Sequence, residues 1–170
     1  ETLFGRKLRM ERTIRVSKKE NEFTISDKIV NTGDTVEPIQ IMYHMNMGYP
    51  LLDEDSIVEI PAEECVPRDA AAADGAEYRL RMDKPTPGYK EKCYYYKFRH
   101  KDGMTSIYQP KHDIGLSIHF DTESLDCFTE WKMMGKRDYV LGLEPGNCTP
   151  DGRDMLRQNG TLAFLQPEET

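Results

Sequence analysis

The sequence predicts an all-β protein built as an antiparallel β-sandwich. About ten short segments alternate apolar and polar side chains, which is the period of a half-buried strand. Gly, Pro, Asn and Asp cluster between these segments, as they do in the turns of sandwiches and barrels. Hydrophobic residues make up 38% of the 170 residues. That share suits a fold in which each strand gives one face to the core and the other to water or a ligand.

The first two segments predict a β-hairpin. Apolar side chains alternate with polar ones over residues 8–16 and again over residues 23–30. The polar residues 17–21 lie between them and indicate a turn. Asn31-Thr32-Gly33-Asp34 then predicts a second turn, because Asn and Gly tolerate positive φ.

The third segment predicts a strand over residues 39–46, ended by Gly48-Tyr49-Pro50. A short strand at 57–60 follows. Residues 61–91 contain four prolines and few periodic apolar positions, so we expect a long connection there. Within it we expect one helical turn at 70–73 and a short strand at 78–82.

The rest of the chain predicts further strands and one short helix. Residues 93–98 and 104–108 form two strands, joined by Lys101-Asp102-Gly103, since Asp-Gly favours a tight turn. A helix is expected within 152–158. The remaining strands are expected at 114–120, 125–132, 139–143 and 162–165. The length suggests a single domain over residues 1–170.

Composition argues against several classes of function. The net charge of −7 leaves no basic surface of the size that nucleic acid needs. No apolar stretch approaches the roughly 20 residues that span a bilayer, so no membrane partner is expected. We find no signal peptide and no CxxC pair among the four cysteines. We therefore expect free thiols in a reducing cytoplasm, no metal and no cofactor.

His44 and Glu144 are the residues best suited to acid–base chemistry. Alternation places His44 on a mostly polar face, which often lines a groove. Glu144 follows an apolar strand and precedes Pro145-Gly146, and strand ends are rigid positions beside open loops. Gly142 shares its face and lets another group approach closely. A surface histidine and a solvated strand-end carboxylate are the simpler interpretations.

Trp131 and Lys132 alternate onto opposite faces of one predicted strand. Trp131 shares its face with Cys127 and Thr129, which favours a place in the core. Lys132 shares the other face with Glu130, which favours a surface ion pair. Tyr94-Tyr95-Tyr96 must divide between two faces, as sheet packing or as an aromatic wall for a sugar ring.

Three stretches resemble the galactose mutarotase-like superfamily, in particular a branch of aldose 1-epimerase-like proteins of unassigned substrate. They are residues 43–50, 128–134 and 142–152. The segment 144–151 is the most specific, because mutarotases carry their general base in a similar setting. In that family a Tyr-Phe-Asn-like run usually follows the acid histidine, where this chain has Met45-Asn46.

The resemblance implies a large antiparallel sandwich with a sugar cleft on one sheet. The full domain is usually near twice this length, so the resemblance implies the C-terminal portion of a longer enzyme and an incomplete sandwich. Its expected partner is a small-molecule sugar, and copies are expected to associate through exposed sheet edges. Glu144 would be the base and His44 the acid, with sugar contacts from Asn46, Trp131, Lys132 and Asn147.

The activity implied is that of an aldose 1-epimerase, an isomerase that interconverts anomers by opening the ring. A base takes the anomeric proton while an acid protonates the ring oxygen, and we expect the two groups on opposite sides of the ring. Two alternatives stay open, namely a non-catalytic carbohydrate-binding module and a structural accessory domain.

Overall fold

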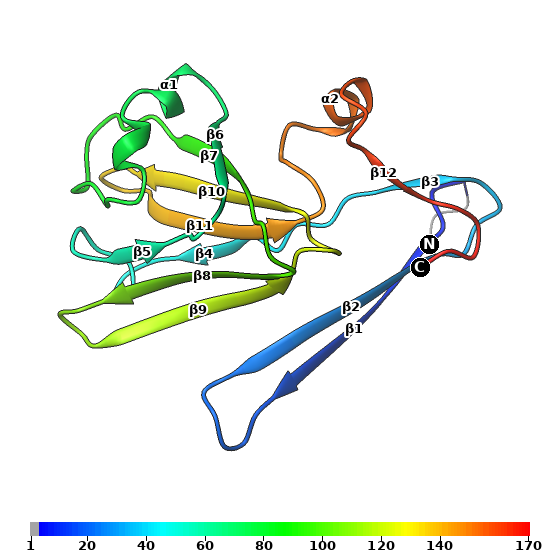
Figure 1. Ribbon diagram of the computed structural model, residues 1–170, viewed down its shortest axis with the longest axis horizontal. Helices are drawn as coiled ribbons and strands as arrows, with labels where there is room; N and C mark the ends of the chain where they lie inside the picture. Colours follow the sequence, from blue (N-terminus) through cyan, green and yellow to red (C-terminus); the bar gives the residue numbers. More distant parts are fainter. Residues whose placement is uncertain (1–3) are drawn as a thin grey trace. The chain divides into compact units, whose positions relative to one another are not determined.

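The computed structural model describes residues 4–170 and shows mostly antiparallel strands with few helices (Figure 1). The described chain divides into two compact units, each taken here by itself. One holds the described residues up to Gln40 with Asn159–Thr170, and the other is Ile41–Gln158. The expectation of a single domain over residues 1–170 stays a prediction.

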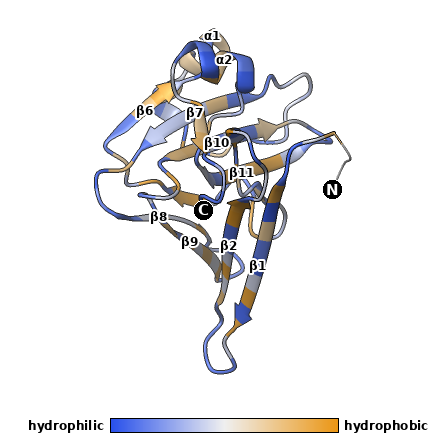
Figure 2. Ribbon diagram, turned by 90° about the vertical axis from the view of Figure 1, so that its right-hand side faces the viewer, coloured by the Kyte–Doolittle hydropathy of each residue, from blue (hydrophilic) through white to orange (hydrophobic). Residues whose placement is uncertain are grey.

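The first unit is built on the expected hairpin. β1 (Leu8–Val16) and β2 (Phe23–Asn31) pair antiparallel over nine residues each. Both strands show the alternation that predicts them (Figure 2). The same unit holds the two-stranded sheet of β3 (Glu37–Ile39) and β12 (Ala163–Leu165). Buried Asn31 joins the two sheets, because its amide donates to the carbonyls of Thr35 and Leu165.

The second unit is a sandwich of two antiparallel sheets, which confirms the predicted fold class. The five-stranded sheet has the order β4-β11-β10-β7-β6, and the three-stranded sheet has the order β5-β8-β9. In chain order these strands are β4 (Met45–Met47), β5 (Ile57–Glu59), β6 (Glu64–Pro67), β7 (Lys92–Lys97), β8 (Asp102–Gln109), β9 (Ile114–Asp121), β10 (Cys127–Met134) and β11 (Tyr139–Gly146).

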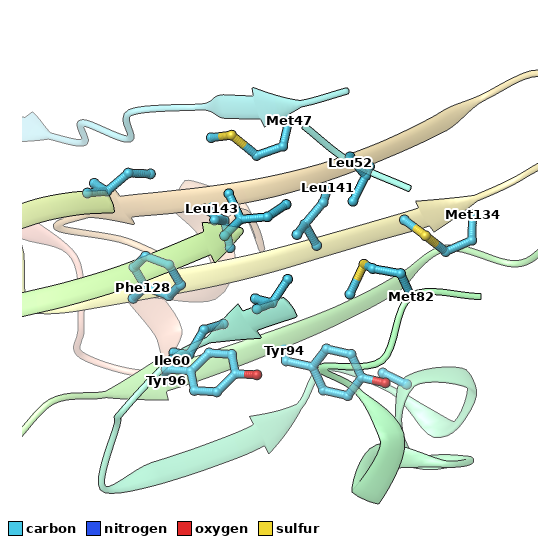
Figure 3. Packing of buried hydrophobic residues seen from close by; sticks show 14 residues of the cluster. Met47, Leu52, Ile60, Met82, Tyr94, Tyr96, Phe128, Met134, Leu141 and Leu143 are labelled. Atoms are coloured by element: carbon cyan, nitrogen blue, oxygen red, sulfur yellow. The ribbon is translucent and has the colours of Figure 1, made fainter. Parts of the chain in front are cut away.

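The core of this unit lies between its sheets. Tyr94, Phe128 and Leu143 are buried on the inner face of the larger sheet (Figure 3). Ile107 of β8 belongs to the same buried cluster. The helical segments are short: α1 (Ala70–Ala73), the 3₁₀ turn η1 (Ala76–Tyr78) and α2 (Arg153–Gln158). The expected helical turn at 70–73 and the helix within 152–158 are therefore confirmed.

The expected single strand at 39–46 is wrong. The chain leaves β3 after Ile39 and enters β4 only at Met45, because the two strands belong to different sheets. Between them only Met42 makes a strand-like bridge, to Gly146. The strict alternation that assigned faces to 39–46 does not hold across this break.

Two details of the middle of the chain also differ from expectation. Residues 78–82 form no strand, while β6 arises in the supposed connection. The predicted Asp-Gly turn is wrong, because Asp102 and Gly103 begin β8 and pair with β9. Gly103 serves packing, since an added Cβ would stand 2.5 Å from the Phe120 ring.

Candidate active site

The outer face of the five-stranded sheet gathers most of the polar candidates. The register aligns one row of residues across four strands and a second row beside it. Residues directly opposite one another share a face of the sheet. The first row is Asn46, Gly142, Trp131 and Cys93, and the second is Glu144, Thr129 and Tyr95.

Glu144 is held near the end of β11 with its carboxylate lying back over the sheet. Its side chain is only 2% exposed, so the carboxylate is not the solvated strand-end group of the simpler interpretation. Gly142 makes this position possible, because an added Cβ there would overlap the Glu144 Oε1 atom. The close approach that Gly142 permits is thus filled by the carboxylate of Glu144 itself.

His44 is positioned by the backbone before β4. The Tyr43 amide donates to the Pro145 carbonyl at 2.9 Å. Asn147 clamps the same segment, since its side-chain oxygen accepts from the Ile41 amide at 2.8 Å and its own amide donates to the Ile41 carbonyl. A Cβ on Gly146 would stand 2.7 Å from that carbonyl, so glycine allows the two backbones to lie this close. Asn147 therefore holds in place the backbone segment that carries His44.

His44 and Glu144 are in direct contact. His44 Nδ1 lies 3.1 Å from Glu144 Oε1, and the imidazole is 53% exposed. The two atoms lack hydrogen-bond alignment, so Oε1 has no hydrogen-bond partner among the described residues. Burial raises the pKa of Glu144, and a charged His44 opposes that shift. A buried carboxylate with a raised pKa beside a histidine is suited to proton transfer.

This contact corrects one expectation. A sugar ring cannot lie between two groups 3.1 Å apart, so the pair does not occupy opposite sides of a ring. The ring oxygen and the anomeric hydroxyl are both bonded to C1. Two groups side by side can therefore serve both atoms from one edge of the sugar.

Trp131 lies beside this pair and not in the core, which corrects the expected packing. Its ring meets the His44 ring edge to face, with centroids 5.8 Å apart and planes at 67°. Its indole Nε1 donates to Glu91 Oε2 at 2.8 Å. Asn46 lies on the same face, exposed and opposite Gly142.

Lys132 lies on the other face of the sheet, so the structure does not bring it to Glu144. Its ammonium is buried, donates to the carbonyls of Arg79 and Arg81, and lies 3.4 Å from Asp83 Oδ2. Glu130 is also fully buried, on this inner face. The expected surface pair of Glu130 and Lys132 is therefore wrong, and Lys132 anchors the segment after η1 instead.

Two residues near the site, Arg68 and Glu91, escaped the sequence analysis. Arg68 Nη2 donates to Glu91 Oε1 at 2.9 Å, and both lie on the Trp131 side of the face. Tyr95 donates from its hydroxyl to Asp151 at 2.7 Å. Glu91 precedes β7 by one residue and alternates with Cys93 and Tyr95. The sequence shows this alternation, but the predicted long connection over residues 61–91 included Glu91, so Glu91 was not read as part of the strand pattern.

Cys93, which lies in the first row of this face, does not add a reactive group to the site. Burial raises the pKa of Cys93 to about 11, so its thiol stays neutral near pH 7. Among residues 4–170 no cluster of three or more His, Cys, Asp or Glu side chains could hold a metal ion. No helix in the described part of the chain is long and apolar enough to cross a membrane.

Comparisons with known proteins agree with this fold. A family model described as "Domain of unknown function (DUF4432)" matches residues 1–170. The comparison with curated proteins finds no match. A crystal structure from Klebsiella pneumoniae, described as a "putative aldose 1-epimerase", superposes with a TM-score of 0.92 at 26% identity over 99% of this chain. The chain spans 45% of the length of that structure. The fold of this chain is galactose mutarotase-like, as the sequence motifs predict.

Proposed function

The chain belongs to the DUF4432 family, and we propose that it is part of an aldose 1-epimerase-like isomerase that interconverts the anomers of a sugar. One observation carries the proposal: a buried carboxylate with a raised pKa touches a half-exposed histidine on the outer face of the five-stranded sheet. The similar Klebsiella structure supports it, because its description names an aldose 1-epimerase.

In the proposed reaction Glu144 is the base and His44 the acid. Glu144 takes the proton of the anomeric hydroxyl, and the C1 oxygen forms a carbonyl as the bond from C1 to the ring oxygen breaks. His44 gives its proton to the ring oxygen. After rotation about C1–C2 the steps reverse, so both residues regain their starting protonation. Each group contributes roughly 10²–10⁴-fold.

We assign different atoms to the two proposed roles. His44 Nδ1 is turned to Glu144, so Nε2 is the nitrogen that faces a sugar. A protonated His44 beside an ionised Glu144 is the reactive form, and the charge on His44 partly offsets the effect of burial on the pKa of Glu144. Trp131 and Asn46 lie on the same face, where they would contact the sugar ring and its hydroxyls. Asn147 supports the His44 segment through Ile41, and its sugar contact stays a prediction.

The test is the approach of a pure anomer to equilibrium, followed by optical rotation or proton NMR with the spontaneous rate subtracted. We expect the native protein to accelerate at least one aldose in a broad panel. Glu144→Gln keeps size and hydrogen bonding but removes the basic oxygen, so we expect at least a hundredfold loss. His44→Ala should lose as much, with sugar affinity within a few fold. Full activity in Glu144→Gln would overturn the assignment.

Sugar binding without acceleration in the native protein would favour the carbohydrate-binding module. A native protein that neither binds nor accelerates any sugar would favour the structural accessory domain.

We also propose a cytoplasmic location, supported by the four free cysteines, since reducing compartments keep thiols unpaired.

A further inference from the structure

The orientation of the His44 imidazole depends on few contacts. Its backbone is fixed through Tyr43 and the neighbouring β11, but the ring is 53% exposed. The contacts that hold the ring are Glu144 on one side and Trp131 on another. A proton donor must stay within a narrow range of angles to the atom it protonates. Whatever fixes Trp131 therefore helps to fix the acid.

Trp131 is fixed by a chain of hydrogen bonds that runs away from the reacting pair. Its indole Nε1 donates to Glu91 Oε2 at 2.8 Å, and Glu91 Oε1 accepts from Arg68 Nη2 at 2.9 Å. Arg68 Nε donates in turn to Asp69 Oδ2 at 3.0 Å. The other oxygen of Asp69 accepts from the Ala72 amide and caps α1. Glu91 is thus tied at both oxygens.

We propose that Glu91 is a positioning residue: it holds the Trp131 indole so that the ring keeps His44 aligned beside Glu144. This role rests on the proposed acid–base function of the pair. Glu91 touches neither His44 nor Glu144 in the contacts of this face and acts through the indole. Hydrogen bonds from Trp131 and then Arg68 hold the pKa of Glu91 below its ordinary value, so it accepts as a carboxylate.

A simpler account treats Glu91 and Arg68 as a surface ion pair of little consequence. Exposed pairs contribute little to stability, and the Glu91 side chain is 42% exposed. The two accounts differ at Trp131. A surface pair can be lost without moving the indole, whereas a positioning carboxylate cannot.

Fluorescence tests the first link, because Trp131 is the one tryptophan of the 170 residues. In Glu91→Ala the indole loses its acceptor, so we expect shifted emission and lower anisotropy. Glu91→Gln retains an acceptor oxygen and should restore the native spectrum. Glu123→Ala is the matched control, since Glu123 is an exposed carboxylate that bonds Lys101 and not the indole. An unchanged Glu91→Ala spectrum would overturn the proposal.

Proton NMR of the His44 imidazole tests the second link without any activity. The nearby indole shifts these protons by its ring current, and we expect Glu91→Ala to change that shift while Glu123→Ala does not. Trp131→Phe removes the donor to Glu91. In that background, adding Glu91→Ala should change nothing further at His44. A His44 spectrum indifferent to Glu91 in the native background would overturn the proposal.

Kinetics on an accepted sugar separate positioning from binding. We expect Glu91→Ala to lower kcat about tenfold with KM within twofold, because a misplaced acid weakens the transition state and not the bound sugar. Glu91→Gln should recover most of kcat. A raised KM at unchanged kcat would make Glu91 a sugar contact and overturn positioning. If the native protein accelerates no sugar, the proposed function fails, while the fluorescence and NMR results still decide the role of Glu91.

Discussion

Gly142 and Glu144 form one structural device: the missing side chain of the first provides the space for the carboxylate of the second. The two residues are separated by one position on β11 and point to the same face. A Cβ on Gly142 would overlap Glu144 Oε1 and stand 3.1 Å from the carboxyl carbon. The buried position of the proposed base therefore depends on a residue that has no functional group.

Gly142→Ala should greatly slow anomer interconversion while the protein stays folded. The added methyl group expels the carboxylate from its position, so we expect a loss on the order of 10²-fold, as for removal of a general base. Gly48→Ala is the control, because an added Cβ there meets nothing within 4 Å. Polarimetry gives the rates and circular dichroism the fold. Equal rates for the two variants would show that Glu144 does not act from this position.

The rate should rise with pH through the raised pKa of Glu144. Burial raises this pKa above the ordinary 4.5, and the base works only when ionised. Activity is therefore low at acid pH and appears at a pH above 4.5. A pH–rate profile of kcat/KM checks this, and an acid limb that survives unchanged in Glu144→Gln would contradict it.

The sequence is enough to predict most strands and the proposed acid–base pair. Alternation is a short-range property, so it located β1, β2 and β7 through β11 within a few residues. His44 and Glu144 stood out because motif order resembled a known family. What alternation cannot see is a change of sheet within one apolar run. For this reason residues 39–46 were misassigned, although His44 itself lies in that break.

Buried charged side chains are the second feature that alternation does not predict. Glu130-Trp131-Lys132 alternates polar and apolar side chains, so the pattern placed the tryptophan inside and the ions outside. The structure reverses this because distant partners compensate the charges. Tyr96 bonds Glu130, and the carbonyls of Arg79 and Arg81 accept from Lys132. Such partners lie about 30 to 50 positions away, beyond the reach of any local pattern.

The hairpin of the first unit should cause copies of the chain to associate. Its paired apolar residues leave Ile14 59% and Phe23 61% exposed on one face. Uncovered apolar strand faces promote contact between molecules. We expect sedimentation velocity to show mass rising with concentration, and the double variant Ile14→Thr, Phe23→Thr to reduce that rise. Thr13→Ser on the opposite face is the control. A monomer at all concentrations would contradict this.

Glu130 should make the fold less stable as pH rises through neutrality. Its side chain is fully buried, with one oxygen bonded by Tyr96 and the other without a hydrogen-bond partner in the described chain. Burial raises its pKa from 4.5 to about 7 in the folded state. Between these values the folded chain holds a proton that the unfolded chain releases. The contribution to stability is therefore complete below pH 4.5 and is lost as pH rises through 7.

Thermal melts at pH 5 and pH 8 measure this effect, and Glu130→Gln isolates it from other titrating groups. Glutamine keeps an acceptor for Tyr96 but cannot ionise, so the melting temperature of the variant should fall less between the two pH values than that of the native protein. Glu123→Gln, at an exposed carboxylate paired with Lys101, should match the native dependence. If Glu130→Gln and the native protein lose the same number of degrees, Glu130 carries no buried proton at pH 5, and Lys132 or Arg79 must hold it ionised throughout.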